Sequence, residues 1–184
     1  MPVWPSTWMS EADADPRRPP RVQEAGTLFR LWSGPGAGDL PDLNVWIALA
    51  VREHPHHAVA ARYWADAMAQ RRGLWFCRVT MLGLVRLLCQ PRVMGTGALD
   101  LLQAWALYGR LRAVPGVGLV AEPEDCEAHL RALVDSELPL PPRLWTDAYL
   151  AALAQASGAR LVTFDRDFER FHLQACLVLP VVPT

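Results

Sequence analysis

Residues 40–49 read Leu-Pro-Asp-Leu-Asn-Val-Trp-Ile-Ala-Leu, a short apolar run that carries one carboxylate, Asp42, and then turns into a helical pattern. Two later segments repeat this arrangement of an acid at the edge of an apolar segment. They are residues 145–150, Trp-Thr-Asp-Ala-Tyr-Leu, with Asp147, and residues 161–168, Leu-Val-Thr-Phe-Asp-Arg-Asp-Phe, with Asp165 and Asp167. Three separated acids at the ends of elements suggest one metal site.

Length and composition bound the class of protein. The chain has 184 residues, enough for one domain with a sizeable core. No apolar run reaches membrane-spanning length and the N-terminus lacks an apolar signal segment, so we expect a soluble protein of the cytoplasm. The net charge of -1 excludes a globally basic nucleic-acid binder, but it allows a local basic groove beside an acidic site. All 18 basic residues are arginines, so any phosphate contact would use a permanently charged guanidinium.

The N-terminal 38 residues are rich in Pro, Arg, Asp and Gly and lack a sustained period. We therefore expect residues 1–38 to be a flexible extension and residues 39–184 to be the folded domain. The extension is either an incidental tail or a partner-binding arm. In the second case the docking segment would be Leu28, Phe29, Leu31 and Trp32.

Strands and helices alternate along the rest of the chain. Predicted strands end near Asp42 and cover residues 74–77, 116–120, 160–163 and 176–182. Predicted helices begin with caps at Asn44 and Thr80, and cover residues 57–70, 96–112, 123–134, 144–156 and 167–171. This order predicts an α/β protein, a three-layer α/β/α sandwich with a mostly parallel central sheet joined by right-handed crossovers.

In such a sheet, ligands collect beyond the carboxyl ends of the strands, which is where Asp42 and Asp165 fall. Asp147, near the start of its helix, could face the same crevice. Carboxylates gathered in one cleft repel one another, and a hard divalent cation such as Mg2+ or Mn2+ relieves that repulsion. Such a site supports metal-assisted hydrolysis of phosphodiesters.

Simpler explanations exist for each acid. Asp42 and Asn44 could be strand-end and cap residues, and Asp147 could be placed for the helix dipole. Asp165 and Asp167 compete for the role of ligand. Because only Asp165 lies directly beyond the strand, we predict that it binds the metal and that Asp167 caps the short helix or supports the site.

Together these segments resemble the PIN-domain ribonucleases, most closely the VapC toxins of bacterial type II toxin–antitoxin systems, over residues 39–182. The resemblance implies a Mg2+-dependent endoribonuclease that acts on tRNA or rRNA, is held inactive by a VapB-like antitoxin and forms a homodimer. It implies that Asp42, Asp147 and Asp165 are catalytic metal ligands. It also implies that Asn44 orients Asp42 and that the hydroxyl of Thr163 supports the site.

The sequence departs from the family at the fourth acid. Aligning residues 79–88 on the family's segment places Arg86 where a Glu is usual. A guanidinium there could neutralise the carboxylates, occupy the place of a second metal or clamp the scissile phosphate. The alternative is a catalytically silent module that binds RNA or an antitoxin. A metal-dependent phosphatase or DNA nuclease is a third class, which fold alone does not exclude.

Overall fold

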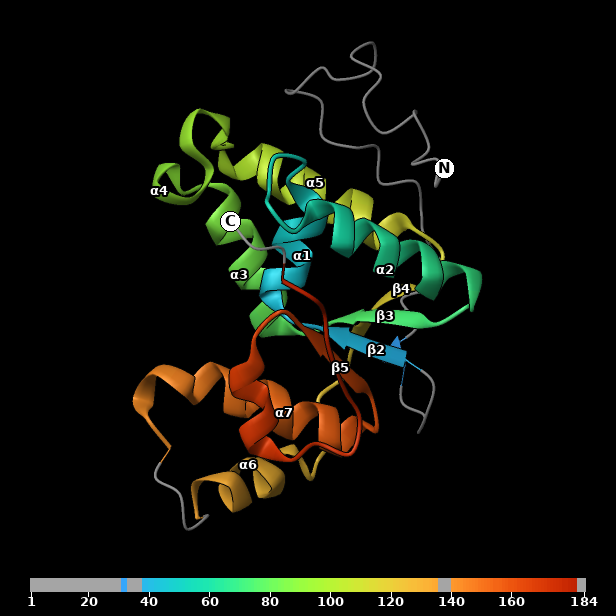
Figure 1. The fold of residues 1–184 in the computed structure, drawn as a ribbon, viewed down its shortest axis with the longest axis vertical. Coiled ribbons are helices and arrows are strands. Elements are labelled where there is room, and N and C mark those ends of the chain that lie inside the picture. The colour runs from blue at the N-terminus through green and yellow to red at the C-terminus, as the bar shows by residue number, and fades with distance from the viewer. Residues whose placement is uncertain (1–30, 33–37, 136–139, 182–184) are drawn as a thin grey trace.

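The computed structural model describes residues 31–32, 38–135 and 140–181, which form a twisted sheet with helices on both faces (Figure 1). Within these residues the sheet has six strands in the order β1-β4-β3-β2-β5-β6, and every neighbouring pair is parallel. The strands are β1 (Leu31–Trp32), β2 (Gly38–Pro41), β3 (Gly73–Phe76), β4 (Val117–Val120), β5 (Arg160–Thr163) and β6 (Cys176–Val178). The predicted parallel sheet is confirmed.

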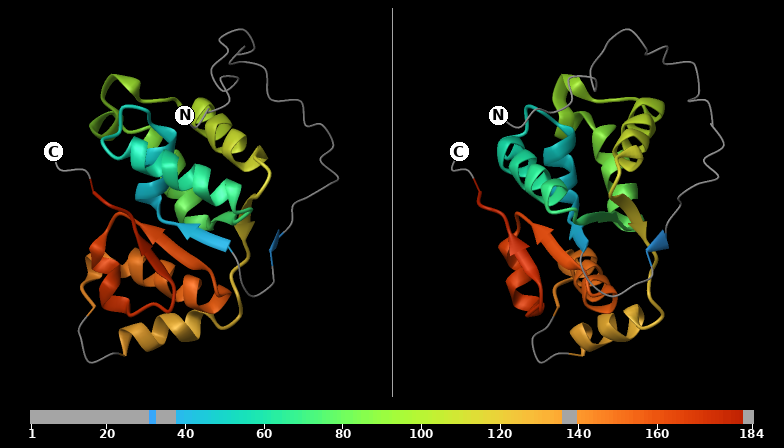
Figure 2. Two further views of the ribbon diagram at one scale, coloured as in Figure 1. Left: turned by 45° about the vertical axis from the view of Figure 1, so that its right-hand side comes forward. Right: turned by 90° about the vertical axis from the view of Figure 1, so that its right-hand side faces the viewer.

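The helices form two layers (Figures 1 and 2). One layer holds α1 (Leu43–Ala50), α2 (His57–Ala69), α3 (Arg78–Leu88), α4 (Pro91–Met94) and α5 (Leu101–Ala113), with the 3-10 turn η2 (Gly95–Gly97) between the last two. The opposite layer holds α6 (Cys126–Val134), η3 (Pro142–Leu144), α7 (Trp145–Ser157) and η4 (Arg166–Phe171). The predicted three-layer sandwich is therefore confirmed.

Each face of the sheet has its own apolar core, because side chains alternate along a strand. On β5, Val162 faces the α1 to α5 layer and Leu161 faces α7. In the first core the ring of Trp46 stacks on Phe76 with centroids 3.7 Å apart. Each core thus packs one layer of helices against one face of the sheet.

Two predicted helix caps are wrong by a few residues. The cap of α1 is Asp42, whose carboxylate accepts a hydrogen bond from the N–H of Leu43 at 2.6 Å, and not Asn44. The cap of α3 is Cys77, and Thr80 lies one turn inside the helix. The Thr80 hydroxyl accepts a hydrogen bond from the Cys77 N–H at 3.0 Å, so it supports the helix end from within.

The helix predicted over residues 96–112 begins later, at Leu101. Asp100 caps it by accepting a hydrogen bond from the N–H of Gln103 at 2.7 Å, while the Gln103 side chain accepts one from the N–H of Asp100 at 3.0 Å. This reciprocal pair fixes the helix start. Before it, Gly95 has φ of 56°, which separates α4 from the rest.

Most of the predicted flexible extension, residues 1–38, lies outside the described residues, as do Leu28 and Phe29 of its docking segment. Leu31–Trp32 form the edge strand β1, which pairs with Leu119 and Val120 of β4. Gly38 is the first residue of β2. The flexibility of the extension stays a prediction.

The indole of Trp75 lies across three neighbouring strands, where glycines leave room for it. A Cβ atom at Gly38 would lie 1.9 Å from Trp75 Nε1, one at Gly73 would lie 2.4 Å from Cζ2, and one at Gly118 would lie 1.9 Å from Cζ3. Real atoms do not approach so closely, so a side chain at any of the three would displace the ring. Glycine is required here for packing.

We predict that Gly118→Ala lowers the free energy of unfolding by about 1 to 3 kcal/mol, because the new methyl group overpacks against the indole. Gly109→Ala is the matched control: nothing lies within 4 Å of its Cβ position, and it sits inside α5. That variant should gain about 0.5 to 1 kcal/mol. Urea denaturation measures both changes, and equal effects would show that the indole does not cover Gly118.

Candidate active site

The candidate site is built around Asp42, at the junction of β2 and α1. Its backbone N–H donates to the carbonyl of Val162 on β5 at 2.8 Å, which extends the pairing of the two strands by one residue. Its side chain is 7% exposed and caps α1. The sheet and the helix together therefore fix the direction of this carboxylate at the carboxyl edge of the sheet.

The hydroxyl of Thr163 links Asp42 to the neighbouring segments. Thr163, the last residue of β5, is fully buried and donates its proton to Asp42 Oδ2 at 2.9 Å. Its oxygen accepts from Asn44 Nδ2 at 3.0 Å and from the N–H of Asp165 at 3.0 Å. A hydroxyl has one donor and two acceptor positions, so all the hydrogen-bonding positions of the Thr163 hydroxyl are occupied.

Asn44 acts on Asp42 through Thr163 rather than directly. While its Nδ2 donates to the Thr163 hydroxyl, its Oδ1 accepts from the N–H of Phe164 at 3.2 Å. The amide thus bridges the first turn of α1 and the end of β5. This contact leaves the Thr163 hydrogen directed at the carboxylate.

Asp165 caps the short helix η4, whereas the sequence indicated Asp167 for that role. The Asp165 carboxylate accepts from the N–H of Asp167 at 2.8 Å. Asp167 instead accepts a hydrogen bond from Arg143 Nη1 through its Oδ2 at 3.0 Å. The two acids are close in sequence, and only the hydrogen-bonding geometry separates their roles.

Arg143 is a residue of the site that sequence reasoning missed. It belongs to η3, directly before α7, and its side chain is 67% exposed. Burial and the charges of Asp165 and Asp167 raise the pKa of Asp147 above its ordinary value, and the charge of Arg143 opposes that rise. The feature of the sequence that could have identified Arg143 is its place just before the segment that carries Asp147.

The three predicted ligands lie near enough to affect one another's charge. Burial raises the pKa of Asp42 to about 6, the hydrogen bonds from Thr163 and Leu43 oppose that rise, and the charges of Asp147 and Asp165 add to it. Asp147 itself lies half-buried in the first turn of α7. The carboxyl edge thus concentrates negative charge around a buried acid.

The arrangement is not a preformed metal site. Among residues 31–32, 38–135 and 140–181, no group of three His, Cys, Asp or Glu side chains is placed to hold a metal ion. The donor chemistry nevertheless fits a hard divalent cation, because Asp42, Asp147 and Asp165 offer only carboxylate oxygens and share an excess of negative charge. A cation would supply the missing positive charge.

Arg86 is exposed in the last turn of α3 and forms no ion pair with another described residue. One turn earlier on the same helix, Gly83 lets α3 approach α1, since a Cβ there would lie 2.6 Å from Leu43 Cδ2. Leu43 directly follows Asp42. The helix that carries Arg86 is therefore packed against the helix that Asp42 caps, while the guanidinium itself remains outside the hydrogen-bonded network.

The sequence matches the PIN domain family over residues 40–172. Ribonuclease VapC41 of Mycobacterium tuberculosis is 39% identical over 136 residues, which are 72% of this chain and 92% of that protein. Ribonuclease VapC38 of the same organism is 38% identical over 128 residues, which are 68% of this chain and 84% of that protein.

Two solved structures share the fold. One is VapBC2 from Rickettsia felis bound to a DNA fragment from their promoter, with a TM-score of 0.56, 12% identity, and coverage of 77% of this chain and 98% of that chain. The other is Mycobacterium tuberculosis VapC20, a sarcin-ricin loop cleaving toxin. It has a TM-score of 0.55 and 18% identity, and the match covers 78% of this chain and 100% of that chain. At these identities the likeness shows the fold alone.

The raised pKa of Asp42 predicts that its ionisation destabilises the metal-free fold. The pKa is about 6 in the folded protein, above the ordinary value of 3.8, so no cost exists below pH 3.8 and the full cost is present above pH 6. In chelator, Asp42→Asn should gain stability relative to the parent as pH rises from 4 to 7, by up to about 3 kcal/mol.

Denaturant unfolding at a series of pH values measures this difference. Asp135→Asn, at the exposed end of α6, controls for the loss of one negative charge. A difference between Asp42→Asn and the parent that stays constant from pH 4 to 7 would contradict the raised pKa.

Proposed function

Because this chain belongs to the PIN-domain family, and within it to the VapC ribonucleases, we propose that it is a Mg2+-dependent endoribonuclease toxin that hydrolyses phosphodiester bonds of tRNA or rRNA. The observation that carries the proposal is the Thr163 hydroxyl, which joins Asp42, Asn44 and the backbone of Asp165 at the carboxyl edge of the sheet. Asp147 lies close enough to raise the pKa of Asp42.

Asp42, Asp147 and Asp165 would hold the cation, with Mn2+ as a possible substitute for Mg2+. When bound, the ion would activate water and neutralise charge on the phosphate. The chain's own contribution is orientation: Thr163 fixes one oxygen of Asp42, and the N–H of Leu43 fixes the other. Asp147 and Asp165 must still close on the ion, since the described residues contain no ready group of three ligands.

Arg143 supplies the positive charge that an RNA phosphate needs at this acidic edge. Asp167 holds one of its N–H groups, and the guanidinium is otherwise largely exposed, so further N–H groups can reach a phosphate oxygen. Its effect on the pKa of Asp147 indicates that it lies on the acidic side of the sheet. We assign Arg143 to substrate binding, next to the acids.

An antitoxin and a second copy of the chain are the proposed protein partners. Helices α3, α4 and α5 carry large apolar side chains that are about half or more exposed, and exposed apolar side chains of this size favour a surface that a partner covers. They are Leu82, Val93, Leu101, Leu102 and Trp105. A VapB-like antitoxin fits the proposal because the Rickettsia felis VapC relative was solved as a VapBC assembly.

The proposed location is the cytoplasm, where tRNA and rRNA are found. In the part of the chain that the structure describes, no helix combines the length and apolar character needed to cross a membrane.

A catalytically silent module that binds RNA or antitoxin is the second candidate. Two points favour it: the resemblance aligns Arg86 with the usual place of the fourth acid, and the described residues hold no preformed group of three metal ligands. In this reading the acids and Arg143 would bind RNA or a partner without cleaving it.

Cleavage of total tRNA and rRNA by the purified chain separates the two candidates. We predict cleavage that requires Mg2+ or Mn2+ and falls by at least about a hundredfold in Asp147→Asn, because a ligand and its charge are removed. Asp135→Asn, at the exposed acid that directly follows α6, should retain parental activity. A parent that binds RNA but does not cleave it with either metal would establish the silent module.

The same cleavage assay compares the contributions of Arg143 and Arg86 to catalysis. We predict that Arg143→Ala lowers kcat/KM about ten- to hundredfold, since a hydrogen bond between charged groups contributes roughly 1.5 to 3 kcal/mol. Its own ion pair is exposed, so folding should be little affected. Arg110→Ala on α5 is the control. Full activity in Arg143→Ala together with loss in Arg86→Ala would move the phosphate contact to Arg86.

A further inference from the structure

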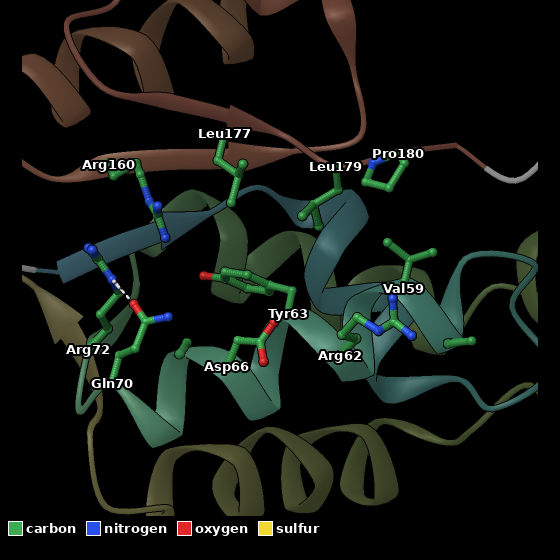
Figure 3. A pocket seen from close by; sticks show the side chains of 12 residues that line it. Val59, Arg62, Tyr63, Asp66, Gln70, Arg72, Arg160, Leu177, Leu179 and Pro180 are labelled. Atoms are coloured by element: carbon green, nitrogen blue, oxygen red, sulfur yellow. Dashed lines mark hydrogen bonds between the residues drawn. The ribbon is translucent and has the colours of Figure 1, made fainter. Parts of the chain in front are cut away.

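A second polar centre lies at the opposite end of the two strands that carry the acids. A pocket of about 450 Å³ opens between α2 and the strands β5 and β6 (Figure 3). Arg160, the first residue of β5, reaches its polar end, whereas Thr163, the last residue of β5, belongs to the acidic edge. The pocket is therefore distinct from the candidate active site.

The polar end of the pocket is organised by Asp39, a fully buried acid on β2. Its carboxylate accepts hydrogen bonds from Arg160 Nε at 2.9 Å, from Arg160 Nη2 at 2.7 Å and from the Tyr63 hydroxyl at 2.9 Å. Arg72 Nη1 lies 3.7 Å from the same carboxylate. Two guanidinium groups thus share one negative charge.

Across the whole pocket one positive charge is left over. Asp39 offsets one of the two guanidinium groups beside it, and Asp66 offsets Arg62, which lies beside Val59 at the far end (Figure 3). The side chains of Arg72 and Arg160 are each about a third exposed, and Figure 3 shows both extending toward the same end of the pocket. Their remaining N–H groups are hydrogen-bond donors within reach of a bound anion.

Aliphatic side chains form one wall of the pocket, from Leu177 to Leu179 and Pro180, and Val59 lies beside Arg62 at the end away from Arg72 and Arg160 (Figure 3). A ligand that satisfies the two arginines and this wall has an anionic head and a hydrocarbon body. A single surplus charge matches a carboxylate, while a phosphate dianion would leave unbalanced negative charge near buried Asp39. The residues thus select both the head group and the body of the ligand.

We propose that this pocket binds an aliphatic monocarboxylate, with the carboxylate between Arg72 and Arg160 and the hydrocarbon body against Leu177 and Leu179. Such a group is carried by a free aliphatic acid and by the C-terminal residue of a polypeptide. Both sources share the chemistry, and suitable probes separate them.

Calorimetric titration of the full chain tests the proposal with four probes: octanoate, octanamide, N-acetyl-leucine and N-acetyl-leucine amide. Saturable binding of octanoate with a single site, at least about tenfold tighter than octanamide, is expected for a free acid. The same preference confined to N-acetyl-leucine over its amide would assign the site to a polypeptide C-terminus. Equal binding of acids and amides, or no saturable binding of either acid, would overturn the proposal and leave Asp39 and its arginines as a structural cluster only.

Two variants place the binding in this pocket. Arg72→Gln should weaken the carboxylate at least about tenfold, and it should fold because Arg160 and Tyr63 still hold Asp39. Leu177→Ala should weaken octanoate by shortening the aliphatic wall. Arg110→Gln, on α5, is the matched control, and thermal melts confirm folding. Unchanged affinity in folded Arg72→Gln would contradict the proposal, whatever the outcome of the RNA assays.

Discussion

The hydrogen bond from the Thr163 hydroxyl to Asp42 is the interaction on which the acidic edge depends. Among the described residues no arginine forms an ion pair with buried Asp42, and the donors to its carboxylate there are this hydroxyl and the N–H of Leu43. The same hydroxyl oxygen accepts hydrogen bonds from the side-chain amide of Asn44 and from the backbone N–H of Asp165. Loss of the Thr163 hydroxyl would therefore remove one of the links between the end of β5 and the start of α1, and it would leave the buried carboxylate with the N–H of Leu43 as its donor.

The same pair of strands carries two carboxylates with opposite environments. At the amino ends of β2 and β5, Asp39 is paired with Arg160 and satisfied by Tyr63. At the carboxyl ends, Asp42 faces other acids, and their charges add to the rise of its pKa. The first arrangement stabilises the sheet, while the second leaves a need for positive charge that a divalent cation and Arg143 are suited to meet.

Apolar patterns predicted five of the six described strands, the sandwich and the position of Asp42 at a strand end, because each of those strands is a local run of apolar residues. They did not predict the edge strand β1, which lies in the segment predicted to be a flexible extension. Hydrogen-bond partners were harder to predict. The caps assigned to Asn44 and Thr80 were wrong because both side chains fit either a cap or a position in the first turn of the helix. Arg143 gave no periodic signal in its proline-rich connector. The pairing of Asp39 with Arg160 spans 121 residues and exists only once β2 and β5 are neighbours.

Binding of Mn2+ to the full chain tests most directly whether the acidic edge holds a divalent cation through Asp42 as Thr163 orients it. The decisive comparison is calorimetric Mn2+ affinity in the parent, Thr163→Ser and Thr163→Val. We expect binding by the parent, near-parental affinity in the serine variant, which keeps the hydroxyl, and at least about tenfold weaker binding in the valine variant. A parent that binds Mn2+ no better than an Asp42→Asn, Asp147→Asn double variant would contradict this expectation.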